Sequence, residues 1–404
     1  MQADIAIIIA AYNRPASLQR LLGSIERANY AGYTGITLVI SIDHSGKNDC
    51  KVIADAFEWK HGNKTVIHQP HNLGLKKHIL SCGDYTLQHD AVIVLEDDLF
   101  VSAQFYDYAQ QAYIFYKNDE EVAGIAFYHN VFNEVAYCPF EPIHDGYDNY
   151  FMQVPCSWGQ LWTKKQWAGF INYANGITNE QVFASLPATV QEWSAASWKK
   201  LFYSYLIQTG KYFVYPRIGL STNFGDAGQH LTDNQTVFQT PLLLSEKTFQ
   251  FSTPADSLSR YDGFFELEGT IYNKLVDDTI AVTFDLNGTK PLTAITTRYL
   301  ISSKKCRKPE QQFEVSVYPY ENNILLRILA VKESNSCFSL GETASFSGAQ
   351  QFNRLTIDFK RVFLSDVFLR NAVRAEFEQS KEFQIGSSFL KPLRFIKNLF
   401  KKSN

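Results

Sequence analysis

The most informative stretch of this chain reads Ala91-Val92-Ile93-Val94-Leu95-Glu96-Asp97-Asp98. Its first five residues are aliphatic or β-branched without a polar interruption, which is typical of a strand buried on both faces of a parallel sheet. Three carboxylates follow at once. Like charges at the end of a buried strand repel one another unless a cation neutralises them, and oxygen ligands suit a hard ion such as Mg²⁺ or Mn²⁺. The alternative is a solvated acidic turn whose carboxylates cap the next helix.

Strands and helices alternate around this stretch, as they do in a doubly wound parallel sheet. Besides residues 91–95, the expected strands are Ile5–Ala11, 36–42 and 65–68. The expected helices between them are 17–28, 52–59 and 74–87. Ligands of such sheets bind at the carboxyl ends of the strands. Here those ends carry Tyr12, Arg14, Asp43 and the acidic turn Glu96-Asp97-Asp98, which are expected to converge on one crevice.

Two glycine-rich nucleotide-binding signatures are missing from the sequence. There is no GxGxxG after the first expected strand and no GxxxxGK[ST], which argues against a dinucleotide-binding or P-loop site. A nucleotide bound at this edge of the sheet would therefore rely on side chains and a metal ion.

The composition indicates a folded chain with more than one part. At 404 residues with 45% hydrophobic content, the chain is long for a single core and is not a disordered one. The formal net charge of −3 gives no indication of a nucleic-acid partner. Six cysteines without CxxC spacing are expected to be free thiols, which favours a cytoplasmic location. The apolar run Ile5–Ala11 is expected to be a strand rather than a signal peptide, and no segment has the length of a membrane span.

Changes in sequence character predict three regions. Residues 1–275 form the α/β region, residues 276–365 a β-rich accessory region, and residues 366–404 a helical tail. In the accessory region, strands are expected at 279–284, 313–318 and 324–330, with a hairpin-type turn at Asp285-Leu286-Asn287-Gly288. Residues 388–402 place apolar and basic side chains on opposite sides of a helix, which fits a peripheral contact with the anionic inner face of the cytoplasmic membrane. The alternative is a terminal helix that docks on the protein itself.

Six motifs follow one another in a set order along the chain. They are Ala10-Ala11-Tyr12-Asn13-Arg14, Ser41-Ile42-Asp43, Asn72-Leu73-Gly74-Leu75-Lys76-Lys77-His78, Leu95-Glu96-Asp97-Asp98, Ser157-Trp158-Gly159 and Asn223-Phe224-Gly225-Asp226-Ala227-Gly228-Gln229-His230. In this order they resemble the motifs of GT-A fold glycosyltransferases, in particular bacterial glycosyltransferase family 2-like enzymes and the N-acetylglucosaminyltransferase I group. The resemblance covers about residues 1–270 and not the accessory region.

The resemblance implies a GT-A fold, which is a Rossmann-like, mostly parallel sheet with flanking helices, here followed by a small β-rich appendage and a terminal amphipathic helix. It also implies transfer of a hexosyl or N-acetylhexosaminyl group from a nucleotide-diphosphate sugar, such as a UDP-sugar, to a glycan or lipid-linked acceptor. The transfer would depend on Mn²⁺ or Mg²⁺, would invert the anomeric configuration, and would serve bacterial surface polysaccharide synthesis.

The resemblance further implies roles for individual residues. Arg14 and Asp43 would lie near the nucleobase, and Glu96 and Asp97 near the ribose and the donor sugar. Asp98 would hold the metal ion, with His230 as a further ligand. The full set of expected donor-binding residues is Ala11, Tyr12, Arg14, Asp43, Lys76, Lys77, Glu96, Asp97, Trp158 and Gly159.

Three of these roles have plain alternatives. Lys76 and Lys77 are equally well explained as solvated helix lysines. Trp158 and Trp162 are candidate platforms for a sugar ring, and the alternative is that they are core residues. His230 has the alternative of a hydrogen-bonded loop histidine.

One departure from the resemblance concerns the catalytic base. Inverting members of the group place an acidic residue just after a tryptophan at the start of a helix, whereas this chain reads Ser197-Trp198-Lys199-Lys200. Either the base has moved, with Glu192 and then Asp226 as the candidates, or the match is out of register, or the enzyme is weakened or uses another mechanism. Two other functions stay open: a sugar-phosphate nucleotidyltransferase, although Tyr12-Asn13-Arg14-Pro15 lacks the glycines that class uses, and a non-catalytic nucleotide-sugar-binding or scaffold protein.

Overall fold

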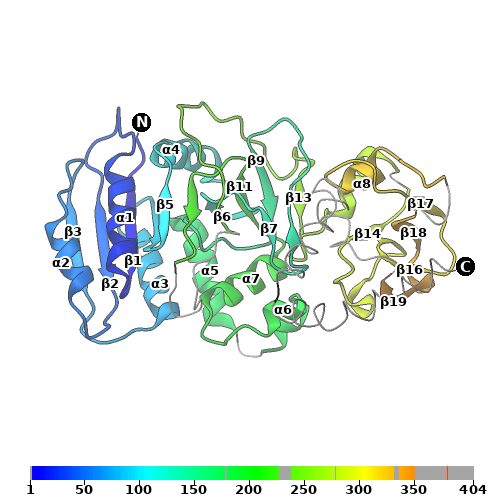
Figure 1. The fold of residues 1–404 in the computed structure, drawn as a ribbon, viewed down its shortest axis with the longest axis horizontal. Helices are drawn as coiled ribbons and strands as arrows, with labels where there is room; N and C mark the ends of the chain where they lie inside the picture. Colours follow the sequence, from blue (N-terminus) through cyan, green and yellow to red (C-terminus); the bar gives the residue numbers. More distant parts are fainter. Residues whose placement is uncertain are drawn as a thin grey trace, which may run out of the picture. The chain divides into compact units, whose positions relative to one another are not determined.

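A nine-stranded sheet forms the framework of the N-terminal part of the chain (Figure 1). Its strand order is β13-β9-β11-β6-β10-β4-β1-β2-β3. The strands are β1 (Ile5–Ala11), β2 (Leu38–Ile42), β3 (Lys64–His68), β4 (Ala91–Glu96), β6 (Val122–Ala126), β9 (Asn149–Met152), β10 (Gln160–Thr163), β11 (Tyr212–Pro216) and β13 (Arg260–Tyr261). β1 to β4 run parallel, whereas β10 is antiparallel to β4 and β6. The sheet is therefore mixed and mostly parallel, which confirms the predicted fold class.

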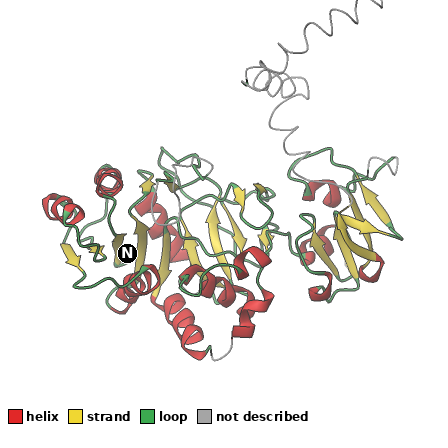
Figure 2. Cartoon of the chain, turned by 60° about the horizontal axis from the view of Figure 1, so that its bottom comes forward, coloured by secondary structure: helices red, strands yellow, loops and turns green. Residues whose placement is uncertain are grey.

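Helices cover both faces of this sheet (Figure 2). The helices of this part are α1 (Pro15–Glu26), α2 (Asp49–Ala56), α3 (Leu75–Gly83), α4 (Phe105–Tyr116), α5 (Lys164–Gly176), α6 (Ala188–Gln191) and α7 (Trp198–Thr209). A further helix, α8 (Gly269–Leu275), contacts β14 (Val282–Asp285) of the accessory region instead. Ile5, Ile7 and Ile9 of β1 share a core with apolar residues of α1, α2 and α4. Alternate strand residues point to the other face, on which α3, α5 and α7 contact one another. Because β1 and β4 are covered on both sides, their sequences show no polar alternation.

Helix boundaries differ from the sequence prediction by a few residues. The helix expected over 52–59 is α2, which begins earlier and ends at Ala56, and the helix expected over 74–87 is α3 followed by a 3₁₀ turn at Asp84–Leu87. α1 begins at Pro15, where a missing backbone N–H costs nothing.

Two short strands, β5 (Leu99–Val101) and β12 (Ser221–Asn223), pair antiparallel beside the end of β4.

This computed structural model describes residues 2–177, 180–226, 238–277, 279–331, 336–350 and 380. The chain divides into two units, Met1–Gln351 and Phe352–Asn404. The region boundaries after residues 275 and 365 remain predictions, and the tail segment 388–402 and His230 lie outside the described residues. None of the six cysteines, all of which lie in the described ranges, forms a disulfide.

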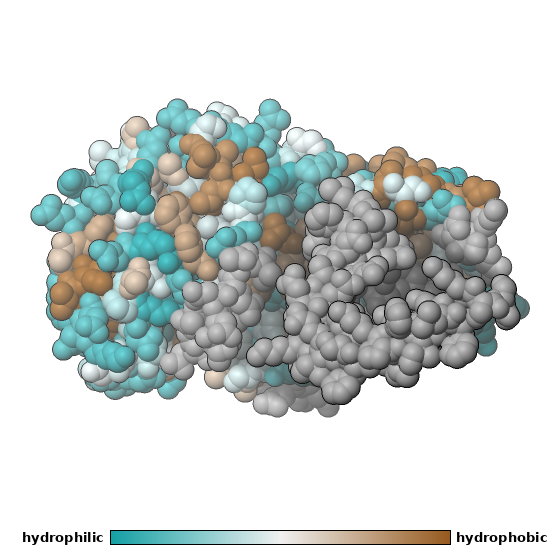
Figure 3. All heavy atoms as spheres, viewed as in Figure 1, coloured by the Kyte–Doolittle hydropathy of each residue, from teal (hydrophilic) through white to brown (hydrophobic). Residues whose placement is uncertain are grey.

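The surface of the described part mixes hydrophilic and hydrophobic residues. On the face in view in Figure 3, separate hydrophobic patches lie among hydrophilic side chains. Within the described ranges, no helix combines the length and the apolar character that crossing a membrane requires.

The accessory region is β-rich, as predicted, but its connections differ from the expectation. Its four-stranded sheet has the order β14-β15-β18-β17, and β16 pairs with β19. The strands are β14 (Val282–Asp285), β15 (Tyr299–Ser302), β16 (Lys304–Cys306), β17 (Gln311–Phe313), β18 (Phe338–Glu342) and β19 (Phe346–Gln350). The predicted hairpin after β14 is wrong, because β14 and β15 are parallel and a crossover connects them.

The strand expected at 324–330 is also wrong, because that stretch begins within a short helix, α9 (Glu321–Leu325). The fully buried side chain of Asn323 accounts for the difference. Its amide accepts hydrogen bonds from the backbone of Ser316 (2.8 Å) and Val317 (3.0 Å) and donates to the carbonyls of Val317 and Tyr320. This side chain fixes a local turn that hydrophobic alternation does not reveal.

A buried charge network links the accessory region to the segment after β13. Glu266 accepts hydrogen bonds from the backbone N–H groups of Leu286 (2.9 Å) and Asn287 (2.7 Å). Lys290 forms an ion pair with Asp262, and Lys304 forms one with the fully buried Asp285. Each of these charges has a partner, which is the condition under which a folded protein tolerates buried ions.

Lys304→Met is expected to destabilise the protein by about 3–5 kcal/mol, because it leaves the carboxylate of Asp285 buried without its cation. Denaturant unfolding of the full chain measures this effect. Arg298→Met is the matched control, since it breaks an exposed pair with Glu342 and is expected to change stability far less. Equal effects of the two substitutions would contradict a structural role for the buried network.

Candidate active site

The carboxyl ends of β1, β2 and β4 meet at one edge of the sheet. The backbone N–H of Asp43 donates to the carbonyl of Ala11 (2.9 Å), and the N–H of Tyr12 donates to Asp97 Oδ2 (3.2 Å). From the later part of the chain, the N–H of Phe224 donates to the carbonyl of Asp98 (3.1 Å). The predicted convergence of these strand ends, and of the described start of the 223–230 loop, is therefore confirmed.

Arg14 is the cation that neutralises the acidic turn. Its Nη1 lies 2.9 Å from Asp98 Oδ2, and its Nη2 pairs with Asp97 Oδ1. Burial alone would lower the pKa of Arg14, but the charges of Asp97 and Asp98 outweigh burial and raise it. Whether Arg14 also lies near a nucleobase remains a prediction.

The acidic turn keeps a strong attraction for protons even with Arg14 in place. Burial raises the pKa of Asp97 to about 6, against the opposing effect of Arg14. Burial, followed by the charges of Asp98 and Asp97, raises the pKa of Glu96 to about 8, although Arg14 and Lys199 act in the opposite direction. One guanidinium therefore does not satisfy three carboxylates.

Asp98 has one oxygen that fits a metal ion. Its Oδ1 is buried and has no hydrogen-bond partner, while Oδ2 is taken by Arg14. Mg²⁺ and similar ions are commonly bound through one or two carboxylates plus substrate phosphates, so a single free carboxylate oxygen suits such an ion. Among the residues that the structure describes, no group of three or more His, Cys, Asp or Glu side chains forms a complete metal site. His230 lies outside these residues.

Asp43 is buried and organises the turn before α3. Its carboxylate accepts hydrogen bonds from the backbone N–H groups of His44 (2.9 Å), Leu73 (2.8 Å) and Gly74 (3.0 Å). Lys76 follows in the first turn of α3 and donates to the carbonyl of Ala195 (3.3 Å), while Lys77 is exposed. Donor binding by these residues remains a prediction.

Gly159 lies where a side chain does not fit. Its φ of 93° is left-handed, and a Cβ would come within 2.9 Å of Ser221 Oγ and 3.3 Å of Leu95 Cδ2. The residue is therefore glycine so that the segment before β10 packs against β4 and β12.

The two tryptophans of this segment have different environments. Trp158 is half-buried, with its ring 4.7 Å from that of Tyr128 and Lys199 Nζ 5.5 Å from its centroid. Trp162 is completely buried among Trp167, Trp198 and Phe202. The expectation that Trp162 is a sugar platform is wrong, because its ring is part of the core.

Neither candidate base is well placed as a free carboxylate beside the acidic turn. Asp226 accepts hydrogen bonds from Ser17 Oγ (2.7 Å) and from Arg20 on α1. Burial would raise the pKa of Asp226, but these two partners lower it. Glu192 is exposed at the end of α6. Both assignments stay untested predictions.

Sequence reasoning did not single out Glu134, which lies between β7 (Phe132–Asn133) and β8 (Cys138–Pro139). Its Oε1 and Oε2 lie 2.8 Å and 3.0 Å from Lys199 Nζ. The signal that points to Glu134 is indirect: a lysine stands where a carboxylate was expected, and such a lysine needs a counter-ion.

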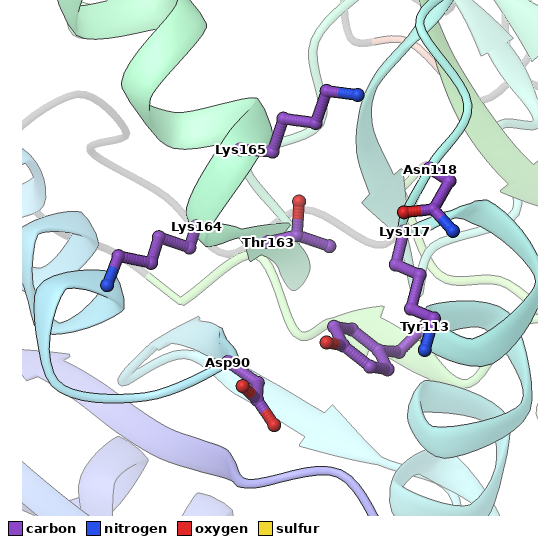
Figure 4. A pocket seen from close by; sticks show the side chains of 7 residues that line it. All are labelled: Asp90, Tyr113, Lys117, Asn118, Thr163, Lys164 and Lys165. Atoms are coloured by element: carbon purple, nitrogen blue, oxygen red, sulfur yellow. The ribbon is translucent and has the colours of Figure 1, made fainter.

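A surface pocket lies at the opposite edge of the sheet (Figure 4). It is lined by Asp90, Tyr113, Lys117, Asn118, Thr163, Lys164 and Lys165, and the side chains of Lys164 and Lys165 point apart at the start of α5. Asp90 directly precedes β4 and Thr163 ends β10. None of the predicted site residues lines this pocket, so it is separate from the strand-end site.

Arg14→Gln is expected to destabilise the protein by about 3–5 kcal/mol at neutral pH, because the nearly buried carboxylate of Asp97 loses its partner. The loss is expected to shrink as the pH falls towards about 6, because Arg14 lowers the pKa of Asp97 to that value and the carboxyl group is protonated at a higher pH when Arg14 is absent. Denaturant unfolding at several pH values measures both effects, with Arg27→Gln as a control at the exposed end of α1. Unchanged stability of Arg14→Gln at neutral pH would contradict the neutralising role.

Known proteins similar to this chain fall into one class. Residues 6–139 match the family model described as glycosyl transferase family 2. No curated protein matches the chain. Similar solved structures include S. aureus TarS 1-349 in complex with UDP-GlcNAc, at 12% identity and a TM-score of 0.36, with 56% of this chain and 60% of that chain covered.

A second structure is the mannosyltransferase PcManGT from Pyrobaculum calidifontis in complex with GDP-Man and Mn²⁺, at 8% identity and a TM-score of 0.34, with 54% of this chain and 55% of that chain covered. A third is GalNAc-T7 with UDP, GalNAc and Mn²⁺, at 11% identity and a TM-score of 0.38, with 54% of this chain and 43% of that chain covered. The chain thus spans 43–60% of the length of these three chains. At these TM-scores the structural likeness is too weak to assign a substrate or a residue role. Residues 6–139 are therefore the part of this chain that is similar to glycosyl transferase family 2.

Proposed function

We propose that this chain transfers a hexosyl or N-acetylhexosaminyl group from a UDP-sugar to a glycan or lipid-linked acceptor, with inversion, in bacterial surface polysaccharide synthesis. The observation that carries the donor half of the proposal is the buried, unpartnered Oδ1 of Asp98. It lies in a turn where Arg14 is already paired with Asp97 and with the other oxygen of Asp98. Such a site calls for an additional cation, and a diphosphate brings the remaining ligands for one.

In this proposal Asp98 holds Mn²⁺ or Mg²⁺, and His230 is a further candidate ligand. The bound ion supplies positive charge to the diphosphate that leaves. Arg14 contacts Asp98 directly, so its guanidinium adds a second positive charge beside the phosphates. Asp43 fixes the 72–74 turn through its three backbone hydrogen bonds, and this turn forms the nucleobase side of the site.

The alternative functions differ at specific residues. A sugar-phosphate nucleotidyltransferase uses a glycine-rich, basic loop after the first strand, whereas Tyr12-Asn13-Arg14-Pro15 has one basic residue and no glycine. That basic residue, Arg14, already forms ion pairs with the carboxylates of Asp97 and Asp98. A non-catalytic binding protein is favoured only by Lys199 in the position of the expected base. Sugar transfer by the purified protein would exclude this second alternative.

Asp98→Asn is expected to weaken Mn²⁺-dependent binding of UDP by at least about 100-fold, because it removes the charge that holds the ion. Calorimetric titration of UDP with and without Mn²⁺ measures the effect, and circular dichroism confirms that the variant is folded. Asp55→Asn is the control, since Asp55 is an exposed partner of Lys51. Metal-dependent UDP binding by Asp98→Asn at the wild-type level would remove Asp98 from the metal site.

We further propose that residues 388–402 contact an anionic membrane from the cytoplasmic side. Basic and apolar residues on opposite sides of a helix favour such a contact. Deleting residues 389–404 is expected to abolish sedimentation of the protein with phosphatidylglycerol vesicles and to leave UDP binding intact. Neutral phosphatidylcholine vesicles provide the control, and equal sedimentation of the truncated protein with the anionic vesicles would contradict the proposal.

A further inference from the structure

We infer that Glu134, in the turn between β7 and β8, is the base that accepts the proton of an acceptor sugar hydroxyl; this inference rests on the proposed function. The β7–β8 turn follows β6, which is parallel to β4 through the intervening β10. The carboxyl ends of β6 and β4 therefore face the same edge of the sheet. This topology brings Glu134 to the side of the site on which the acidic turn lies.

Lys199 connects Glu134 to the position at which the base was expected. Ser197 caps α7, with its Oγ accepting from the backbone N–H of Lys200 (3.2 Å), so Lys199 lies in the first helical turn. A cation is unfavourable there because the helix N-terminus is already positive. Both oxygens of Glu134 compensate this charge. A carboxylate is thus supplied from another loop, at hydrogen-bond distance from the side-chain amine of the lysine that stands at this helix position.

The ion pair of Lys199 and Glu134 lies beside two tryptophan rings. Lys199 Nζ is 5.5 Å from the centroid of Trp158 and 5.2 Å from that of Trp193. Trp158 directly precedes Gly159, which packs against Leu95 of β4 next to the acidic turn. The side chains of Lys199 and Glu134 are 14% and 20% exposed, so the carboxylate is held in place and still accessible to a substrate.

A row of aromatic rings beside Glu134 indicates a carbohydrate acceptor. Tyr137 lies 6.4 Å from Phe132, Phe132 lies 5.9 Å from Phe238, and Phe238 lies 4.8 Å from Trp158. Tyr137 is 63% exposed, and its φ of 53° is left-handed, which is a strained conformation for a non-glycine residue. Exposed aromatic faces bind the apolar faces of sugar rings. The row leads from the surface to Trp158, next to Lys199.

The proposed step is a single displacement. The acceptor hydroxyl oxygen forms a bond to the anomeric carbon of the donor sugar while its proton passes to a carboxylate oxygen of Glu134. The bond between the anomeric carbon and the diphosphate oxygen breaks, and the nucleoside diphosphate leaves with the electron pair. Glu134 then releases the proton to water. Lys199 acts as a positioning residue that orients the carboxylate before the acceptor binds.

The test measures transfer from UDP-glucose, UDP-galactose, UDP-GlcNAc and UDP-GalNAc to p-nitrophenyl hexosides. Glu134→Gln is expected to lower kcat by roughly 10²–10⁴-fold while the Kd for the UDP-sugar with Mn²⁺ stays within about twofold. Glu134→Asp is expected to recover part of the activity. Glu120→Gln is the matched control, because Glu120 is an exposed partner of Lys165 outside the site.

Further readouts separate a base from a structural carboxylate. In Lys199→Met, kcat is expected to fall while the Kd for the UDP-sugar with Mn²⁺ stays unchanged, because the carboxylate of Glu134 remains but is no longer held in place. Tyr137→Ala is expected to raise the acceptor KM and not the donor KM. If wild type transfers sugar and Glu134→Gln keeps kcat within about threefold, the inference is overturned while the proposed function stands. If wild type neither binds nor turns over any of the four UDP-sugars, the proposed function fails and the role of Glu134 fails with it.

Discussion

The contact between Arg14 and the two carboxylates Asp97 and Asp98 is the interaction on which the site depends. Three acids at the carboxyl end of a buried strand are unfavourable unless a cation lies beside them. β1 is the strand next to β4, so the turn after β1 is the place from which a cation can reach the acids. The strand order therefore explains why a basic residue follows β1: the acidic turn at the end of β4 lies next to it.

Charge alternates across the edge of the sheet as a consequence. Arg14 is followed by the acidic turn, then by Lys199, and then by Glu134. In this order each anion has a cation on one side, yet Asp98 Oδ1 has no partner. In the proposed function, the metal-bound diphosphate would lie at Asp98 Oδ1 and the acceptor hydroxyl beside Glu134. The donor and acceptor halves of the reaction are then separated by Trp158 and Lys199, which contact each other.

The strands of the sheet were predictable because burial on both faces requires uninterrupted apolar runs, which β1 and β4 have. Strand ends were predictable for the same reason, since the first polar residues mark them. The accessory region was harder to predict. Its fold depends on the hydrogen bonds of the Asn323 side-chain amide and on the parallel pairing of β14 with β15, and neither produces a repeating hydrophobic pattern in the sequence. Glu134 was missed because its partner Lys199 is 65 residues away, and only the fold brings them together.

Phosphorus NMR of a reaction with a UDP-sugar, a glycoside acceptor and Mn²⁺ tests the central claim most directly. The account predicts that UDP signals grow in step with the amount of sugar transferred, because the bond to the anomeric carbon is the one that breaks. Pyrophosphate released from UTP and a sugar phosphate would contradict it, because that product belongs to nucleotidyl transfer. So would binding of the UDP-sugar without any transfer, because a binding protein leaves the donor intact.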